Sequence, residues 1–405
     1  MPTPIHDLIA AEAITTHFQP IVSVKKRALV GVEALSRGLD GPVRLHAPQQ
    51  LFSWAQEASL VTELDELCRT TALRTFAAWP QRPNDLLLFL NVDLTRLNQG
   101  QMSAMSLQHA VTGAGLRPQD IVLEFSDRDA ALAPGLRVLF ETCQSFGFTV
   151  ALSDLDGSPA ALRRLTLLKP DIAKADQSVV GGISRDPVRQ QLLRSLCALT
   201  RLHGGLTVGV GVETEDDAAA CLEQGTDLLQ GFLFGRPNAV QQLAIALSQA
   251  SVERSASKAK AGAVSRAQMR QRENERHLQL LDRILQALAG TEADGFEAKL
   301  AGFVNAVASL ECLYVLDRQG QQVTSTVVWQ HKKEGARSLL FAPAPRGADH
   351  SLKDYYLGLT LGDQPRFVSD AYVSLATGNL CRTLTTGFKA EDGRDHVLCM
   401  DIRSA

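Results

Sequence analysis

Short apolar runs recur through roughly the first 240 residues, and stretches with helical periodicity separate most of them. Alternation of strand-like runs with helices favours a sheet whose strands are linked by crossover helices. A chain with eight such runs can close the sheet on itself, so the pattern predicts a (β/α)8 barrel. The runs are Phe18–Val24, Leu29–Leu35, Leu86–Val92, Ile121–Phe125, Thr149–Leu152, Ile172–Lys174, Leu206–Val212 and Leu228–Phe232.

The size and composition of the chain leave room for more than this barrel. With 405 residues, of which 45% are apolar and 21% charged, the chain can form two or three ordinary globular domains. Its formal net charge of -3 gives no indication of nucleic-acid or membrane-surface binding.

Cysteine usage and the N-terminus indicate the compartment. The seven cysteines have no C-x-x-C spacing, and their odd number favours reduced thiols that pack as small apolar groups. Residues 1–13 carry Asp7 and Glu12 and lack the long apolar run of a signal peptide. No stretch reaches the roughly 18 apolar residues of a membrane span. We therefore expect a cytoplasmic protein without membrane insertion.

The composition changes after the predicted barrel. Residues 251–277 hold seven Lys or Arg against three Glu, and four leucines then follow at spacings of 3, 4 and 3. This spacing is typical of a helix with a narrow apolar seam. The helix either packs on its own domain or connects two copies of the chain in a dimer, and the sequence leaves both open. The leucines are Leu278, Leu281, Leu285 and Leu288.

Antiparallel signals follow Gly290. An alternating run at 313–316, a turn at 318–320 and a return run at 323–329 predict a hairpin, and further strand-like runs follow at 366–368, 382–388 and 396–402. We therefore predict three parts, namely a barrel at 1–250, a linker and connector helix at 251–290, and a smaller α+β domain at 291–405. The seam and the last domain both offer self-complementary surface, so we expect a homodimer.

Polar side chains stand at or just after the ends of seven of the barrel runs, and the carboxyl ends of barrel strands share one face. One such residue alone is usually a helix cap or a solvated loop residue, but seven at equivalent positions indicate a site. They are Glu33, Asn91, Glu124, Asp154, Lys174, Glu213 and Gln230. The first four offer the oxygen ligands that hard divalent cations prefer. Lys174 and Arg37 suit phosphate or guanine.

The segments around these positions resemble the EAL domain family in order and spacing, from about residue 10 to 245. They are Phe18–Ile21, Val32–Arg37, Asn91–Val92, Leu123–Asp127, Lys169–Asp176, Gly211–Thr214 and Gln230–Pro237. The resemblance implies a modified TIM barrel. Active members of the family hydrolyse cyclic di-GMP to linear pGpG with two Mg²⁺ or Mn²⁺ ions, which activate a water and clamp the phosphate.

The resemblance also assigns roles to residues. It implies that Glu33, Asn91, Glu124 and Asp154 are metal ligands. Lys174 and Glu213 take the catalytic positions, Lys174 at the attacking water or phosphate and Glu213 as a brace for the metal shell. The implied ligand-binding residues are Gln19, Leu35, Arg37, Asp176, Gln230 and Arg236.

The chain departs from the family pattern at two carboxylates. The family's adjacent Asp pair reads Ser153-Asp154 here, and the first Glu of its Glu-Gly-Val-Glu motif is Val210. A neutral hydroxyl and an isopropyl group cannot replace two anionic ligands of a binuclear site, so Lys174 and Glu213 are expected to be vestigial. Asp127 replaces a Glu, and the loop Leu155–Ser158 departs from the family's Phe-Gly-Thr-Gly.

The last domain resembles the PAS/Cache-like domains that follow EAL in some cytoplasmic proteins. The resemblance rests on Cys312–Gly320 and Asp349–Tyr356. It implies dimerisation and a small-ligand pocket, which Tyr355 and Tyr356 either line or support from the core.

Three interpretations of function follow. The first is a catalytically inactive bacterial EAL protein that binds cyclic di-GMP and regulates through it. The second is a scaffold that acts on an unknown protein partner without nucleotide, and the third is an active Mg- or Mn-dependent phosphodiesterase. Whether the chain is an enzyme stays open, with inactivity favoured. The expected cofactor is one divalent cation (Mg, Mn or Ca) or none.

Overall fold

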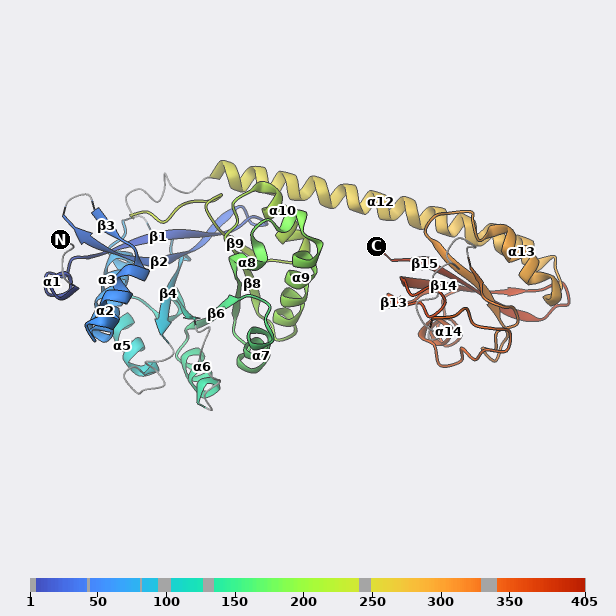
Figure 1. Ribbon diagram of the computed structural model, residues 1–405, viewed down its shortest axis with the longest axis horizontal. Helices are drawn as coiled ribbons and strands as arrows, with labels where there is room; N and C mark the ends of the chain where they lie inside the picture. The colour runs from blue at the N-terminus through green and yellow to red at the C-terminus, as the bar shows by residue number, and fades with distance from the viewer. Residues whose placement is uncertain are drawn as a thin grey trace. The chain divides into compact units, whose positions relative to one another are not determined.

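The computed structural model describes residues 5–41, 44–80, 82–93, 103–126, 135–239, 249–328 and 341–404. Its contacts divide the chain into two compact units, Met1–Arg266 and Ala267–Ala405 (Figure 1). We call them the barrel unit and the C-terminal unit and describe each by itself.

The strands of the barrel unit form one sheet in the order β1-β9-β8-β7-β6-β5-β4-β2-β3, and β1 also pairs with β2, which closes the barrel. All eight predicted strands are present, and a short β3 extends the sheet. The bounds are β1 Ile14–Ser23, β2 Ala28–Asp40, β3 Arg44–His46, β4 Leu87–Asp93, β5 Ile121–Ser126, β6 Thr149–Leu155, β7 Ile172–Ala175, β8 Leu206–Val210 and β9 Leu228–Gln230.

One strand runs against the direction expected for a simple (β/α)8 barrel. β1 is antiparallel to both β2 and β9, whereas the pairs from β2 through β4 to β9 are parallel. Only a four-residue turn, 24–27, joins β1 to β2, and a parallel connection needs a crossover of about a dozen residues. The turn therefore forces a hairpin, and the result is the modified barrel that the family resemblance implies.

β2 also differs from its prediction. Its parallel pairing with β4 ends at the pair Glu33 and Phe89. Beyond Glu33 it continues to Asp40 as an antiparallel partner of β1 and β3. Glu33 therefore lies in the middle of a long strand rather than at its end. The two strands separate beyond Glu33, and this leaves a gap at the carboxyl end of the barrel next to Asn91 on β4.

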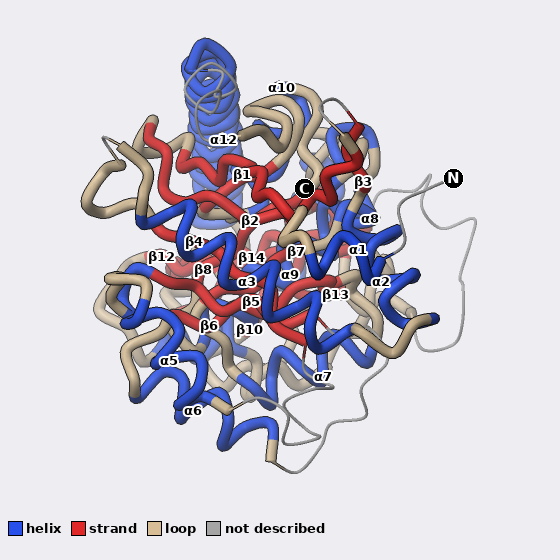
Figure 2. The backbone as a smooth tube through the Cα atoms, turned by 90° about the vertical axis from the view of Figure 1, so that its left-hand side faces the viewer, coloured by secondary structure: helices blue, strands red, loops and turns tan. Residues whose placement is uncertain are grey.

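Helices surround the barrel strands, and Figure 2 shows α5, α6 and α7 outside them. Asp186 caps α9 by accepting hydrogen bonds from the N–H groups of Val188 and Arg189, as short polar residues do at helix starts. The bounds are α1 Ile5–Ala10, α2 Pro48–Glu57, α3 Val61–Ala77, α5 Ala104–Gly113, η1 Pro118–Asp120, α6 Leu136–Ser145, α7 Pro159–Leu168, α8 Gln177–Val180, η2 Ile183–Arg185, α9 Pro187–Leu202 and α10 Glu215–Gln224.

The barrel holds two apolar layers. Alternate side chains fill its interior, and the others pack against the helices, as the two-residue period of strands requires. The interior cluster consists of Ile21, Phe89, Val122, Ala151, Ile172, Val208 and Leu228.

Helix α12, Gln249–Ala289, runs without a break for 41 residues. Its first turns belong to the barrel unit, where Val252 is buried in the core. Its last turns bury Leu281, Ile284 and Leu288 in the core of the C-terminal unit. The predicted leucine seam therefore packs largely on its own domain, while Leu278 is 37% exposed. Most of the seam is therefore not available for pairing with a second copy of the chain.

The C-terminal unit is a second, antiparallel sheet in the order β11-β10-β15-β14-β12, with β13 beside β14. The return strand of the predicted hairpin is reduced to two residues. The bounds are η3 Ala293–Gly295, α13 Phe296–Phe303, β10 Leu310–Leu316, β11 Val327–Val328, α14 Asp354–Thr360, β12 Arg366–Val368, β13 Tyr372–Val373, β14 Leu380–Lys389 and β15 Asp395–Arg403. Tyr355 and Tyr356 are buried in the core on one face.

The structure bears on two of the compositional expectations. All seven cysteines are buried and carry free thiols, as predicted for reduced cysteines. Within the described ranges, no helix combines the length and the apolar character of a membrane span.

Candidate functional site

Two glutamates and a lysine meet at the carboxyl end of the barrel strands. The Lys174 ammonium on β7 donates to Glu33 Oε2 at 2.8 Å and to Glu124 Oε2 at 2.6 Å. Lys174 is 2% exposed and Glu124 is 4% exposed. The three residues come from β2, β5 and β7, so only the closed barrel brings them together. The cluster carries two potential negative charges for one positive charge.

Side-chain amides extend this cluster toward β1 and β9. Asn91 donates to Glu33 Oε1 at 3.2 Å, and Gln230 donates to Glu33 Oε2 at 2.7 Å and to Gln19 Oε1 at 3.1 Å. Gln19 in turn donates to the carbonyl of Gly235 at 3.4 Å. Among the described residues, no donor reaches the buried Oε1 of Gln230. This acceptor is therefore available to a ligand or a water.

Burial and charge act differently on the two glutamates. Burial raises the pKa of Glu124 to about 7, the Glu33 carboxylate adds to the rise, and Lys174 opposes it. Burial also acts upward on Glu33, but Lys174 and the two amides outweigh it and hold the pKa of Glu33 below its usual value. Burial lowers the pKa of Lys174, but the two carboxylates stabilise its ammonium form and raise the pKa overall. Glu33 and Lys174 thus form a charged pair with a weaker acid beside them.

The end of β6 re-aims its side chains through an irregularity in the pairing with β7, between Leu152 and Leu155. Asp154 sits there with a positive φ of 56°, and its Oδ2 accepts a 2.7 Å hydrogen bond from the Ser126 hydroxyl. Ser153 is buried, and its hydroxyl donates to the Phe125 carbonyl at 3.3 Å. The serine side chain is thus committed to the backbone.

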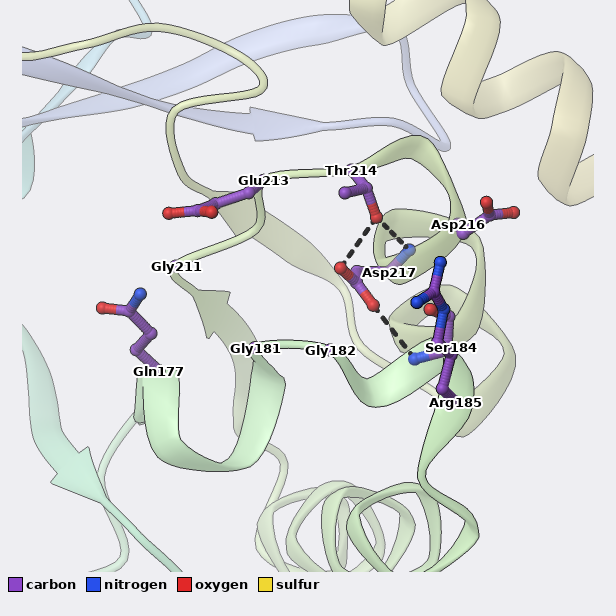
Figure 3. A pocket seen from close by; sticks show the side chains of 10 residues that line it. All are labelled: Gln177, Gly181, Gly182, Ser184, Arg185, Gly211, Glu213, Thr214, Asp216 and Asp217. Carbon is purple, nitrogen blue, oxygen red and sulfur yellow. Dashed lines mark hydrogen bonds between the residues drawn. The ribbon is translucent and has the colours of Figure 1, made fainter.

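A cavity of about 410 Å³ adjoins the ends of β7 and β8. Glu213 lines it and is exposed (Figure 3). Val210 ends β8 without a polar group. Asp217 closes the far side, where it accepts from the N–H of Ser184 at 3.0 Å and from the Thr214 hydroxyl at 2.7 Å.

A second cavity, of about 150 Å³, lies where β2 and β4 separate. Leu35, Leu90 and Asn91 line it together with an ion pair on α3, in which Arg69 contacts Asp65 at 2.6 Å. Both charged side chains are about nine-tenths buried. The central cluster thus has a cavity at the β2–β4 side and another at the β7–β8 side.

A family model described as the EAL domain matches residues 5–237, which is more than half of the chain. The chain belongs to the EAL domain family. The fold and the order of the motifs agree with this assignment.

Curated relatives of this EAL barrel include two named for cyclic di-GMP. The bifunctional diguanylate cyclase/cyclic di-GMP phosphodiesterase MucR of Pseudomonas aeruginosa is 26% identical over 244 residues, which are 59% of this chain and 36% of MucR. The cyclic di-GMP phosphodiesterase PdeL of Escherichia coli is 25% identical over 243 residues, or 57% of this chain and 67% of PdeL. The chain thus spans about a third of MucR.

Solved structures give the same fold. The Bacillus subtilis YkuI protein, in complex with substrate c-di-GMP and calcium, matches over 100% of both chains with a TM-score of 0.75 and 21% identity. Klebsiella pneumoniae BlrP1, a calcium and c-di-GMP complex, matches 56% of each chain with a TM-score of 0.51 and 25% identity. Both of these solved proteins hold c-di-GMP together with calcium.

The remaining predicted ligand-binding residues lie around the EAL site in different settings. Leu35 and Arg37 follow Glu33 on β2, and the half-buried Arg37 donates to the Ser36 carbonyl at 2.9 Å. Burial lowers the pKa of Arg37. Asp176 caps α8 through the N–H of Ser178, and the exposed Arg236 stacks on Phe232. Asp127 lies outside the described residues.

The oxygen donors of the EAL site suit a hard cation but are few. Within the described ranges, no group of three or more His, Cys, Asp or Glu side chains is close enough to hold a metal ion. The carboxylates that converge, Glu33 and Glu124, share Lys174 between them. A cation there therefore depends on amide oxygens and on the ligand's own oxygens, which is the usual situation of Mg²⁺ at a phosphate.

Sequence reasoning missed several residues of this site. Ser126 orients Asp154, and the Asp65–Arg69 pair lines the cavity beside Asn91. His17 lies near Arg37, and burial together with that guanidinium lowers its pKa. The 65/69 spacing on one helix face was visible in the sequence, but nothing in it placed that face at the gap between β2 and β4.

Proposed function

We propose that this EAL protein binds cyclic di-GMP and acts in signalling as a catalytically inactive receptor. The observation that carries the proposal is the central cluster with a cavity on each side. A cyclic dinucleotide has two bases on either side of a phosphate ring, and this arrangement matches one base per cavity with a phosphate at Lys174. The buried Oε1 of Gln230, which no donor from the described ranges reaches, supplies an acceptor in the same place.

Inactivity is proposed from the two replaced carboxylates. The Ser153 hydroxyl is buried against the Phe125 carbonyl, and Val210 has no polar group to offer. Two metal ions need anionic ligands that bridge them, and the family resemblance assigns such ligands to these two positions. We propose at most one divalent cation, near Glu33, Asn91, Glu124 and Asp154. Because the acidic side chains of the described ranges do not converge into a complete metal site, oxygens of the bound phosphate would have to complete its shell, and the cation would neutralise phosphate charge.

Calorimetry on the full chain tests binding. We expect cyclic di-GMP to bind, and more tightly with Ca²⁺ or Mg²⁺ than with chelator. Arg37→Ala should weaken binding by roughly 10–100-fold, since a charge-assisted hydrogen bond is worth about 1.5–3 kcal/mol. Arg117→Ala, which removes an exposed guanidinium paired with Asp120, is the matched control and should leave the affinity unchanged. The absence of heat with any cation would refute the proposal.

An active phosphodiesterase is the second candidate, because Glu33, Glu124 and Lys174 are assembled in the barrel. Formation of pGpG, followed by chromatography with Mg²⁺ or Mn²⁺, separates the two. We expect negligible turnover by the natural chain and partial recovery in Ser153→Asp/Val210→Glu. Either change alone should do little, because both ligands serve one cluster and their effects are not additive. Robust turnover by the natural chain restores the enzyme.

We propose a homodimer in the cytoplasm, a PAS/Cache-like fold for the C-terminal unit, and an unknown protein as the recipient of the signal. Light scattering at micromolar concentration tests the first, since a mass near 43.8 kDa would exclude the dimer. Should the chain neither bind nor cleave the nucleotide, the scaffold interpretation takes precedence.

A further inference from the structure

The first turns of α12 lie along α10, and ion pairs join the two helices at both ends of α10. Arg254 and Lys258 pair with Glu215 and Asp216 in the first turn of α10. Near its last turn, Arg266 pairs with Glu223 at 2.8 Å. All of these residues are partly exposed, so each pair is weak and reversible. Such contacts add to the packing of α10 and can bias the position of its first turn without locking it.

The start of α10 is tied to the ligand-binding face. Thr214 caps the helix through the N–H of Asp217, and Asp217 binds the backbone of Ser184 (Figure 3). Glu213, which lines the larger cavity, is the residue before Thr214. A shift of the first turn of α10 therefore moves this cavity wall.

The loop before α10 is also held against the central cluster. The N–H of Val212 donates to the carbonyl of Gln230 at 3.0 Å, and the Gln230 side chain binds Glu33. The two backbones cross so closely that a Cβ on Gly231 would lie 2.0 Å from the Val212 carbonyl oxygen. Such contact transmits displacement rather than absorbing it. Contacts thus run without a gap from Arg254 on α12 to Glu33.

We propose that α12 is a control element that sets the affinity of the site for cyclic di-GMP through its hold on the start of α10. This inference rests on the proposed function, because it names the regulation of the same site. Residues 267–276 of α12 are exposed on all sides, and the helix then enters the core of the C-terminal unit. A rotation or shift of the helix caused in that unit changes the ion pairs at Glu215 and Asp216, and with them the cavity wall.

The test compares the two ends of α10 in the full chain. Arg254→Glu/Lys258→Glu puts like charges against Glu215 and Asp216, whereas Arg266→Glu makes the same change at the far end. We expect the first variant to bind cyclic di-GMP about 3- to 10-fold more weakly, from two lost surface pairs. It should also speed hydrogen exchange at amides 211–217. Arg266→Glu should do neither. Arg254→Glu alone should also weaken binding. Adding Glu215→Arg to it reverses the charges of this pair and should restore much of the lost affinity, which a merely structural defect would not allow.

The outcomes separate the two proposals. If the natural chain binds cyclic di-GMP and the double variant matches it in affinity and exchange, α12 has no control role and the binding function stands. If both variants weaken binding equally, the hold on the start of α10 is not specific and the inference fails. If the natural chain does not bind, the proposed function falls, and unchanged exchange at 211–217 removes the role of α12 as well.

Discussion

Glu124 in the barrel unit and Asp401 in the C-terminal unit are both buried carboxyl groups, 4% and 3% exposed. Glu124 lies against an ammonium group, Lys174, and shares it with Glu33. Asp401 lies on β15 between two neighbouring strands and receives hydrogen bonds from neutral groups. The Thr383 hydroxyl donates at 2.8 Å, the Cys312 thiol at 3.2 Å and the Tyr372 hydroxyl at 3.3 Å.

The origin of the partners differs as well. Cys312 and Thr383 stand directly opposite Asp401 in the antiparallel ladder, so local pairing supplies the donors. In the barrel the partners come from β2, β5 and β7, which are not neighbours in the sheet. Burial raises the pKa of Asp401, and the hydroxyl and thiol donors only partly oppose the rise. The neutral donors only partly offset the cost of burying the Asp401 carboxylate, whereas the Lys174 ammonium favours negative charge on Glu33.

The difference teaches how to distinguish a site from a core. The barrel cluster of two acids and one ammonium keeps ionic groups buried, at a cost in desolvation. A phosphate can replace a carboxylate as the partner of the ammonium, and a cation can replace the ammonium as the partner of a carboxylate. A neutral network within a sheet satisfies its acid internally and leaves nothing for a ligand.

Lys174→Met should be the most damaging of the changes. It leaves Glu33 and Glu124 buried without a cation, and breaking a buried ion pair in this way typically costs about 3–5 kcal/mol. Urea unfolding followed by the fluorescence of Trp54 and Trp79 in the barrel measures the loss. Lys25→Met is the control, because its pair with Asp227 is exposed and is worth less than about 1 kcal/mol. Equal stability of the two variants would mean that the barrel acids are already neutral.

Asp401→Asn should change how the stability of the C-terminal unit depends on pH. A raised folded pKa means that the native state binds the proton more tightly. The contribution is therefore complete below the unfolded value of about 3.9, and it is lost as pH rises through the folded value. Relative to the variant, the natural chain should lose at most about 1.4 kcal/mol per pH unit in that window. Hydrogen exchange of β10, β14 and β15 measures it, and parallel pH profiles would contradict it.

Thr383→Val should have the smallest effect, about 1 kcal/mol, because Tyr372 and Cys312 still donate to Asp401. The loss should grow as pH rises, since an ionised Asp401 needs the missing donor more. Thr385→Val is the matched control, because its hydroxyl donates to the Tyr355 carbonyl and not to Asp401. A pH-dependent loss in the control would show that the network extends beyond the four residues.

The sequence predicted all eight barrel strands because buried strands are short apolar runs, and this signal is local. The direction of β1 is not in those runs but in the turn 24–27, whose length decides between a hairpin and a crossover. The length of β2 depends on its pairing with β1, β3 and β4, which the run of apolar residues does not show. The leucines of α12 fit either packing on their own domain or pairing with a second copy of the chain. An apolar seam shows that a surface must cover it but not which surface.

The candidate site was predictable in membership but not in contacts. The ends of the predicted apolar runs placed Glu33, Glu124 and Lys174 on one face, although β2 continues beyond Glu33 in the structure. Their hydrogen bonds depend on barrel closure, which no local pattern encodes. The irregularity at Asp154 and the direction of the Ser153 hydroxyl arise from pairing with β7, and Asp65 enters through the packing of α3. The Asp401 network depends likewise on the register of three strands.

Closure of the barrel through β1 and β9 has a consequence for synthesis. The β1–β2 hairpin leaves the ribosome well before its partner strand β9, because Leu229 and Gln230 follow some 200 residues later, which takes roughly 10–40 s at ordinary translation rates. Until then β1 has a free edge, and free edges pair with whatever strand is near. The same residue, Gln230, completes the hydrogen bonds around Glu33. The hydrogen bonds around Glu33 therefore cannot be completed on the nascent chain before the barrel is whole, and until then the hairpin is exposed to non-native strand pairing.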